Sequence, residues 1–140
     1  MHLDRAEAMH RATSADHGVL ATLNRTGTAD LVPVCFAILD GVVAIPIDSI
    51  KPKRSTALGR VRNLERDPRA TLLIERWDPA DWGRLWWVRI SLIRAAVAPE
   101  LGARLEQSLR DRYPQYAMAA FVAILAFRVD AIGGWAAAGD

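Results

Sequence analysis

The sequence contains few cysteines, lysines and histidines, and the low numbers of cysteine and histidine limit the disulfides and metal sites that the protein can have. The single cysteine, Cys35, rules out an internal disulfide framework and suits a reducing compartment, so we expect a cytoplasmic protein. The three histidines show no ligand spacing, so we expect no metal site. No apolar run approaches the roughly 18 residues of a membrane span, and the N-terminus lacks the apolar core of a secretory signal.

Several common catalytic and nucleotide-binding motifs are also missing. The sequence contains no G-x-S-x-G, no Walker loop and no G-x-G-x-x-G, and no residues pair as a hydrolytic acid and base. With 140 residues, 51% of them apolar and 24% charged, the chain has the composition of an ordinary globular protein. We therefore expect a single domain over residues 1–140 with a real core.

The order of the expected strands, turns and helices predicts an α+β domain built on a small closed barrel with flanking helices. Tight turns join most of the expected strands, and Asp40-Gly41 is a strong signal for a two-residue hairpin. The six expected strands are Gly18–Asn24, Asp30–Leu39, Val42–Ile47, Arg69–Trp77, Arg84–Val97 and Phe121–Val129. The expected helices are Leu3–Thr13, a helix from Arg54 or Ser55 to the break at Asp67-Pro68, and Pro99–Arg112, and Asp130–Asp140 is expected to be a tail.

Two of the expected strands contain proline, which cannot donate to a strand ladder. Pro33 and Pro46 either mark an edge or a bulge, or they open the sheet and leave main-chain groups for a flat ligand. Cys35 lies in the middle of an expected strand, so we interpret it as a packed small residue rather than a nucleophile.

Positive charge is concentrated in Lys51–Arg69, which we call the basic segment. It holds seven cations and two anions, whereas the rest of the chain carries three more anions than cations. The segment contains both lysines and runs into an expected helix start, where main-chain N–H groups and the helix dipole favour an anion. It is either a solvated helix face or the binding site of an anionic partner.

Tryptophan is abundant, with five residues, four of them between Trp77 and Trp87. These side chains form either a core or dimer interface, or a wall against a planar ligand. The strand Arg84–Val97 carries apolar residues on both faces, so we expect protein or a second subunit to cover both.

Four segments resemble one family: HGVLATLNRTGTADLVPVCFAI, the Asp40-Gly41 hairpin, KPKRSTALGRVRNLERDPRATLLIERW and RLWWVRI, spanning about Asp16–Val97. The chain resembles the pyridoxamine 5′-phosphate oxidase-like split β-barrels. More narrowly, it resembles the actinobacterial flavin/deazaflavin oxidoreductases that use coenzyme F420. The run R-N-L-x-x-D-P-R-A-T is the most specific part of this resemblance.

The resemblance implies a homodimer with cofactors in grooves between the subunits. In that family, residues matching Lys51, Lys53, Arg54 and Ser55 hold the cofactor phosphate, and Arg60 reaches an anionic tail. The ring is lined by the backbone and side chains of Pro33, Val34, Cys35 and Phe36, with Ile47, and is covered from the partner subunit by Trp77 or Trp135. No catalytic residue is assigned, and a proton would come from solvent, Tyr113 or Tyr116.

The leading hypothesis is therefore an oxidoreductase that uses reduced coenzyme F420 to transfer hydride to a small organic acceptor. The first alternative is an FMN-binding enzyme of the same fold, for which seven cations exceed what one phosphate needs. A second is a non-catalytic flavin or haem carrier, although the scattered histidines suggest no axial ligand. A nucleic-acid-binding module is disfavoured, because aromatic residues do not interleave with the basic segment.

Overall fold

The computed structural model describes residues 1–48 and 55–137. Three of the expected phosphate-binding residues, Lys51, Lys53 and Arg54, lie outside the described residues, and Ser55 is the first residue of the second helix. Within the described residues one sheet contains seven strands: β1 (Gly18–Leu23), β2 (Ala29–Val34), β3 (Ala37–Leu39), β4 (Val42–Asp48), β5 (Arg69–Arg76), β6 (Trp86–Arg94) and β7 (Phe121–Ala136).

The three predicted α-helices are confirmed within a few residues of their expected bounds. They are α1 (Arg5–Ser14), α2 (Ser55–Arg66) and α3 (Pro99–Arg112), and two 3₁₀ turns, η1 (Trp82–Arg84) and η2 (Pro114–Tyr116), complete the fold. Asp4 caps α1 by accepting a hydrogen bond from the N–H of Glu7 at 2.8 Å. None of the helices in the described part of the chain combines the length and apolar character that a membrane crossing requires.

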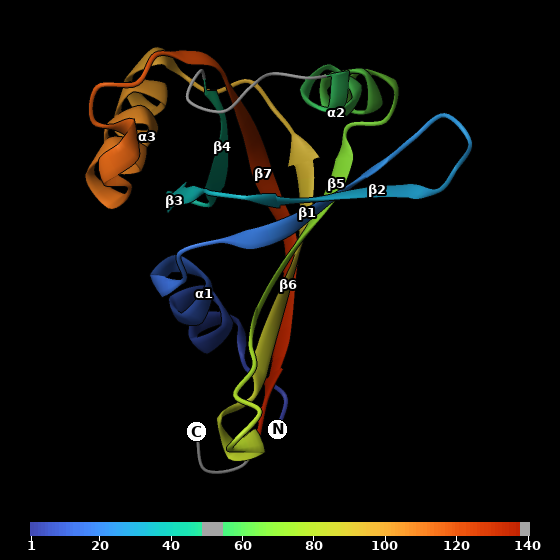
Figure 1. Ribbon diagram of the computed structural model, residues 1–140, viewed down its shortest axis with the longest axis vertical. Coiled ribbons are helices and arrows are strands. Elements are labelled where there is room, and N and C mark those ends of the chain that lie inside the picture. Colours follow the sequence, from blue (N-terminus) through green and yellow to red (C-terminus); the bar gives the residue numbers. More distant parts are fainter. Residues whose placement is uncertain (49–54, 138–140) are drawn as a thin grey trace.

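The strands follow the order β2-β1-β5-β6-β7-β4-β3, and every neighbouring pair is antiparallel. The sheet curls, and its two end strands, β2 and β3, are consecutive in the chain (Figure 1). The predicted hairpin turn between β3 and β4 is confirmed, because Asp40 and Gly41 both have positive φ angles, 53° and 73°.

The prediction of one strand over Asp30–Leu39, and with it a closed six-stranded barrel, was wrong. Residues up to Val34 pair with β1, whereas Ala37–Leu39 pair with β4 at the other end of the sheet. Cys35 and Phe36 form the bend between these two strands. The result is a half-barrel that is open between its two end strands.

The C-terminal strand is longer than predicted, because Asp130–Ala136 continues β7 instead of forming a tail. A bulge at Asp130 shifts the register, and Trp135 then lies opposite Trp87. Gly134 permits this close pairing, since a Cβ there would lie 2.6 Å from the Trp87 carbonyl oxygen.

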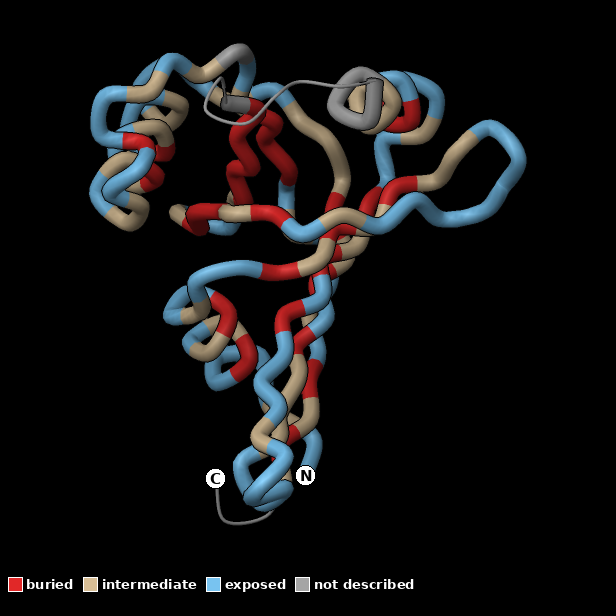
Figure 2. Tube along the Cα trace, in the orientation of Figure 1, coloured by how far each residue is buried: buried red, intermediate tan, exposed pale blue. Residues whose placement is uncertain are grey.

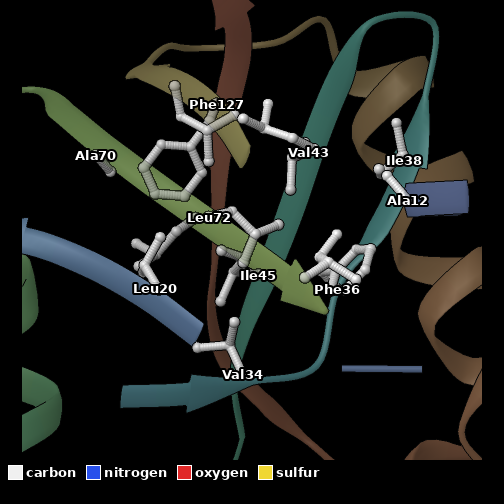
Figure 3. Packing of buried hydrophobic residues seen from close by; sticks show 14 of the residues in the cluster. Ala12, Leu20, Val34, Phe36, Ile38, Val43, Ile45, Ala70, Leu72 and Phe127 are labelled. Carbon is white, nitrogen blue, oxygen red and sulfur yellow. The ribbon is translucent and has the colours of Figure 1, made fainter. Parts of the chain in front are cut away.

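Buried residues occur along the strands and in the helices α1 and α3 (Figure 2). The main cluster includes Phe36, Ile45, Leu72 and Phe127, each at most 1% exposed, and Figure 3 shows them pointing into one interior. A second cluster lies where α3 packs on β3 and β4, and its members are Ala37, Ala44, Leu105, Leu109 and Tyr116. Leu105 and Leu109, one helical turn apart on α3, are both fully buried.

Candidate functional site

The opening between the end strands is the first candidate site, and its register explains why it exists. The β3–β4 ladder stops at the pair Ala37–Ala44. If it continued, Phe36 would face Ile45 and Cys35 would face Pro46. Proline has no N–H to donate, so the ladder cannot be completed there. We call this region the split: the outer edge of β2, the bend Cys35–Phe36, and β4 from Ile45 onward.

Both prolines lie where the sheet has an open side. Pro33 is on β2, an end strand, and pairs only with Val19 of β1. Pro46 pairs with Ile124 of β7, while β3 has already ended on the other side of β4. The interpretation of these prolines as edge residues is confirmed for the described strands. The outer edge of β2 faces no other described strand, whereas Pro46 is buried between Ile45 and Ile47.

The residues predicted to line a cofactor ring divide into two groups. The side chains of Val34, Phe36 and Ile47 are 7%, 0% and 6% exposed and belong to the core. These three side chains are therefore not placed to contact a ligand. Pro33 is exposed on the edge of β2. Cys35 is half-buried and packs against the second core cluster, although it lies at the bend and not in the middle of a strand as expected.

Arg60 is brought next to the split by the packing of α2. A groove of about 500 Å³ lies between α2 and the first two strands, and it is lined by Thr22, Ala29, Asp30, Leu31, Val32, Gly59 and Arg60. Leu31 and Val32 immediately precede Pro33 on the β2 edge. The predicted tail-binding cation and the predicted ring-binding edge therefore belong to one continuous surface.

A polar network that the sequence analysis missed fixes α2 in this position. The buried Asn63 donates to the Thr22 hydroxyl at 3.1 Å and to an Asp30 carboxylate oxygen at 2.9 Å. Asn24 donates to the other Asp30 oxygen at 3.0 Å. These hydrogen bonds, that of Asn24 foremost, lower the pKa of Asp30. Asn63 is the asparagine of the R-N-L motif, so this motif was the feature of the sequence that could have indicated the network.

The expected ring-covering tryptophans lie elsewhere in the protomer. Trp77 is 55% exposed at the end of β5, and its ring lies 5.6 Å from that of Trp82. Trp135 is on the distal part of β7. We call the β5–β6 hairpin tip with the end of β7 the arm. The arm extends away from α2 (Figure 1), so one protomer does not bring these tryptophans to the split.

Neither tyrosine is placed as a proton donor. The Tyr113 hydroxyl accepts from the Phe36 N–H at 3.2 Å and lies 2.8 Å from the Asp16 carbonyl oxygen, to which it donates. Burial is the main cause that raises the pKa of Tyr113, so the phenol stays protonated. Tyr116 is 6% exposed in the second core cluster. The Tyr113 proton is thus engaged by a carbonyl oxygen and Tyr116 is buried, and the source of a proton stays a prediction.

A second groove, of about 660 Å³, lies between α1 and the arm, and we call it the α1 groove. Its lining includes two of the three histidines, His10 and His17, with Trp77 and Trp86 as aromatic walls. Arg11 lies over the Trp86 ring at 5.5 Å. Asp16 contacts His17 Nδ1 at 2.6 Å, and this hydrogen bond is the main cause that lowers the pKa of Asp16.

The histidines looked scattered in the sequence, and only the packing of α1 brings two of them together. Their spacing of seven residues, across the end of a helix, matches no common ligand motif. Within the described residues no group of three or more His, Cys, Asp or Glu side chains is placed to hold a metal ion.

Comparison with known proteins identifies the fold. No family model and no curated protein matches the sequence. Among solved structures, an FAD-binding protein from Mesorhizobium loti is 14% identical, with a TM-score of 0.67 over 96% of this chain and 93% of that one. A candidate pyridoxamine 5′-phosphate oxidase from Corynebacterium glutamicum is 16% identical, with a TM-score of 0.59 over 96% and 94%. The chain has a half-barrel fold of this kind.

The α+β class and the likeness to a pyridoxamine 5′-phosphate oxidase-like split barrel are thus confirmed, with seven strands in place of six. A haem-binding protein from Mycobacterium smegmatis has the same architecture. It is 20% identical, with a TM-score of 0.71 over 96% of this chain and 54% of that one. At these identities the likenesses establish the fold alone.

Proposed function

We propose that the protein is an oxidoreductase that binds reduced coenzyme F420 at the split and reduces a small organic acceptor. The observation that carries this proposal is that Arg60 lines a groove beside the open edge of β2. The ends of β4 and α2 enclose residues 49–54 in the sequence, which include Lys51, Lys53 and Arg54. A planar ring needs an open edge, and a phosphate with a glutamyl tail needs several cations.

The described residues fit such a cofactor. The first turn of α2 presents main-chain N–H groups without helical partners, which favour a phosphate beside Ser55. Arg60 follows in the adjoining groove, where it would attract a longer anionic tail. When bound, the deazaflavin supplies the hydride. The protein would hold the ring against the β2 edge, exclude water from one face and leave the acceptor side open.

The cations of the basic segment do not all lie beside the split. Arg69 is paired with Asp67 through two hydrogen bonds of 2.8 and 3.0 Å and lines a different pocket with Ser91 and Asp130. Arg69 therefore does not count toward the split. The remaining cations of the segment include Lys51, Lys53, Arg54 and Arg60, which are more than the single phosphate of FMN requires. FMN remains the alternative cofactor, and the likeness to flavin-binding structures supports it.

The proposed enzyme is a homodimer. Leu73 lies in the middle of the sheet, between Val19 of β1 and Arg89 of β6, yet 38% of it is exposed. An apolar side chain on a central strand is expected to be covered, and within the described protomer nothing covers this face. We propose that in this dimer the arm of one copy, with Trp77 or Trp135, covers the split of the other.

Titration with coenzyme F420 and with FMN, followed by tryptophan fluorescence, tests the proposal. We expect the double variant Lys51→Ala/Lys53→Ala to bind coenzyme F420 at least about tenfold more weakly. Arg69→Ala is the matched control, because it removes a cation that Asp67 already neutralises, and its affinity should stay within about twofold. Preference for FMN would support the alternative, and binding of neither cofactor would refute the proposal.

A haem carrier is the second candidate, and the α1 groove is the observation that favours it. The groove is lined by two histidines, two tryptophans and Arg76, whose guanidinium would pair with a haem carboxylate. Titration with haemin should then give a shifted Soret band that His10→Ala or His17→Ala removes. His2→Ala is the control, since His2 forms a main-chain β-bridge with Trp135 and does not line the groove. A band unaffected by all three variants would exclude this candidate.

A further inference from the structure

Phe36 lies at the bend between β2 and β3, where its main chain is outside both ladders. A main-chain N–H and C=O in this buried position each require a hydrogen-bond partner. Two consecutive residues at the end of α3 provide them. Tyr113 Oη accepts from the Phe36 N–H at 3.2 Å, and Arg112 Nη1 donates to the Phe36 carbonyl oxygen at 3.0 Å.

The same two side chains also hold the connection between α1 and β1. The Tyr113 hydroxyl donates to the Asp16 carbonyl oxygen at 2.8 Å, and Arg112 Nη2 donates to the carbonyl oxygen of Ala15. The phenol has one proton, and the Phe36 carbonyl oxygen at 3.1 Å is the longer of its two acceptors. Arg112 therefore satisfies the Phe36 carbonyl, while Tyr113 serves the N–H of Phe36 and the Asp16 carbonyl.

The end of α3 is rigid enough to act in this way. Leu105 and Leu109 are fully buried beneath the helix, and the Tyr113 N–H closes the last turn on the Leu109 carbonyl at 3.1 Å. The Arg112 guanidinium lies 5.3 Å from the centre of the Phe36 ring, which adds an attraction between cation and ring. Three segments far apart in sequence therefore meet at one point.

We propose that Arg112 and Tyr113 are positioning residues of the split: they replace the missing ladder at Phe36 and hold the open edge in the form that receives a planar ligand. The part of this inference that concerns the cofactor rests on the proposed function. Its physical reason is that an edge without a strand partner changes shape easily unless other groups fix its main chain.

The chain contains a matched control two residues earlier on the same helix. Arg110 Nη1 donates to the carbonyl oxygens of Tyr116 at 2.7 Å and Ala119 at 2.8 Å, and its guanidinium lies 4.5 Å from the Phe121 ring centre. Arg110 thus makes the same kinds of contact as Arg112. Its hydrogen bonds stabilise η2 and the approach to β7 instead of the bend at Phe36.

The test compares Arg112→Lys, Tyr113→Phe and Arg110→Lys in the full chain. Amide hydrogen exchange at Phe36 reports the local main chain, with Leu72 as a reference in the core. Losing a hydrogen bond at Phe36 should speed exchange there by about tenfold in Arg112→Lys and Tyr113→Phe. Coenzyme F420 should bind about tenfold more weakly to both variants, with a shifted absorption maximum, and within about twofold of wild type to Arg110→Lys.

The outcomes separate this inference from the proposed function. Unchanged exchange at Phe36, or equal losses in Arg110→Lys and Arg112→Lys, would overturn the positioning role while leaving cofactor binding by the wild type intact. Failure of the wild type to bind coenzyme F420 or FMN would instead overturn the proposed function. The exchange data would then still decide whether Arg112 and Tyr113 hold Phe36. Tyr113→Phe removes a single oxygen atom, so it remains informative if Arg112→Lys fails to fold.

Discussion

The split and the arm carry complementary halves of what a cofactor site needs, and one protomer keeps them apart. The split has open strand edges, Arg60 and the flanks of the lysine-containing residues 49–54, but its described wall exposes little aromatic surface. The arm has the exposed rings of Trp77 and Trp82, at 55% and 66%, and a groove of mixed charge.

This difference has a structural consequence. The two regions lie at opposite ends of the long strands β5 and β6 (Figure 1). A ligand held by the cations of the split and covered by a tryptophan of the arm therefore requires two copies of the chain. If a single copy binds the cofactor fully, the arm has another role. The α1 groove, which the arm helps to line, is then the candidate site for that role.

Breaking the proposed dimer should have the largest effect. Leu73→Asp places a carboxylate on the exposed centre of the sheet, where a second copy would have to bury it. We expect dimerisation to weaken at least about a hundredfold and coenzyme F420 affinity to fall with it, although no cofactor residue changes. Light scattering after size-exclusion chromatography measures the first effect and fluorescence titration the second.

The control for this variant is Met118→Asp, which adds the same charge at a side chain that is 96% exposed beside α3. It should leave both the mass and the affinity unchanged. Full cofactor binding by monomeric Leu73→Asp would show that the split functions alone, and the proposed covering role of Trp77 or Trp135 would have to be abandoned.

Arg60 should give an intermediate effect on the split side. Removing its charge in Arg60→Ala should weaken coenzyme F420 binding about tenfold, because the groove beside β2 would lose its described cation. FMN affinity should change less, since FMN has no glutamyl tail. Arg62→Ala is the control, because Arg62 is an exposed arginine of the same helix that does not line this groove. Equal losses in the two variants would indicate diffuse attraction instead of a defined site.

The sequence predicted the elements well but not the bend that creates the split. Pro99–Arg112 matches α3 at both ends, and Asp40-Gly41 forms the expected turn. The run VPVCFAIL, in contrast, contains no turn residue after Pro33, so periodicity favours one continuous strand. The causes of the bend lie elsewhere in the chain, in Pro46 on another strand and in Tyr113, which is 77 residues from Phe36.

The candidate site was predictable only where charge or a resemblance pointed to it. Arg60 was predicted to reach the anionic tail of a cofactor. It lines the groove beside β2, and its role stays a prediction. Arg69 was counted as part of the basic segment, yet its pairing with Asp67 and its place at the start of β5 separate it from the split. The grouping of His10 and His17 depends on how α1 packs against β6 and β7, which no local pattern encodes.

The smallest effect is expected at Asp67, and its direction depends on pH. Hydrogen bonds from the Arg69 side chain, and then from its main-chain N–H, lower the pKa of Asp67 to about 2. A lowered pKa in the folded state stabilises the fold above the ordinary value near 3.9, and this contribution is lost as the pH falls through about 2. Asp67→Asn should therefore lower the melting temperature by about 2 °C at pH 7, and its difference from wild type should shrink as the pH falls from about 4 through about 2.

The exposed Glu65 of the same helix provides the comparison, because Glu65→Gln removes the same charge without removing that pairing. A difference between wild type and Asp67→Asn that is as large at pH 2 as at pH 7 would contradict the assignment to this ion pair. Coenzyme F420 affinity should stay within about twofold in Asp67→Asn, since Arg69 lies away from the split. A clear gain in affinity would mean that the released Arg69 reaches the cofactor, and Arg69 would then have to be counted among the cations of the split.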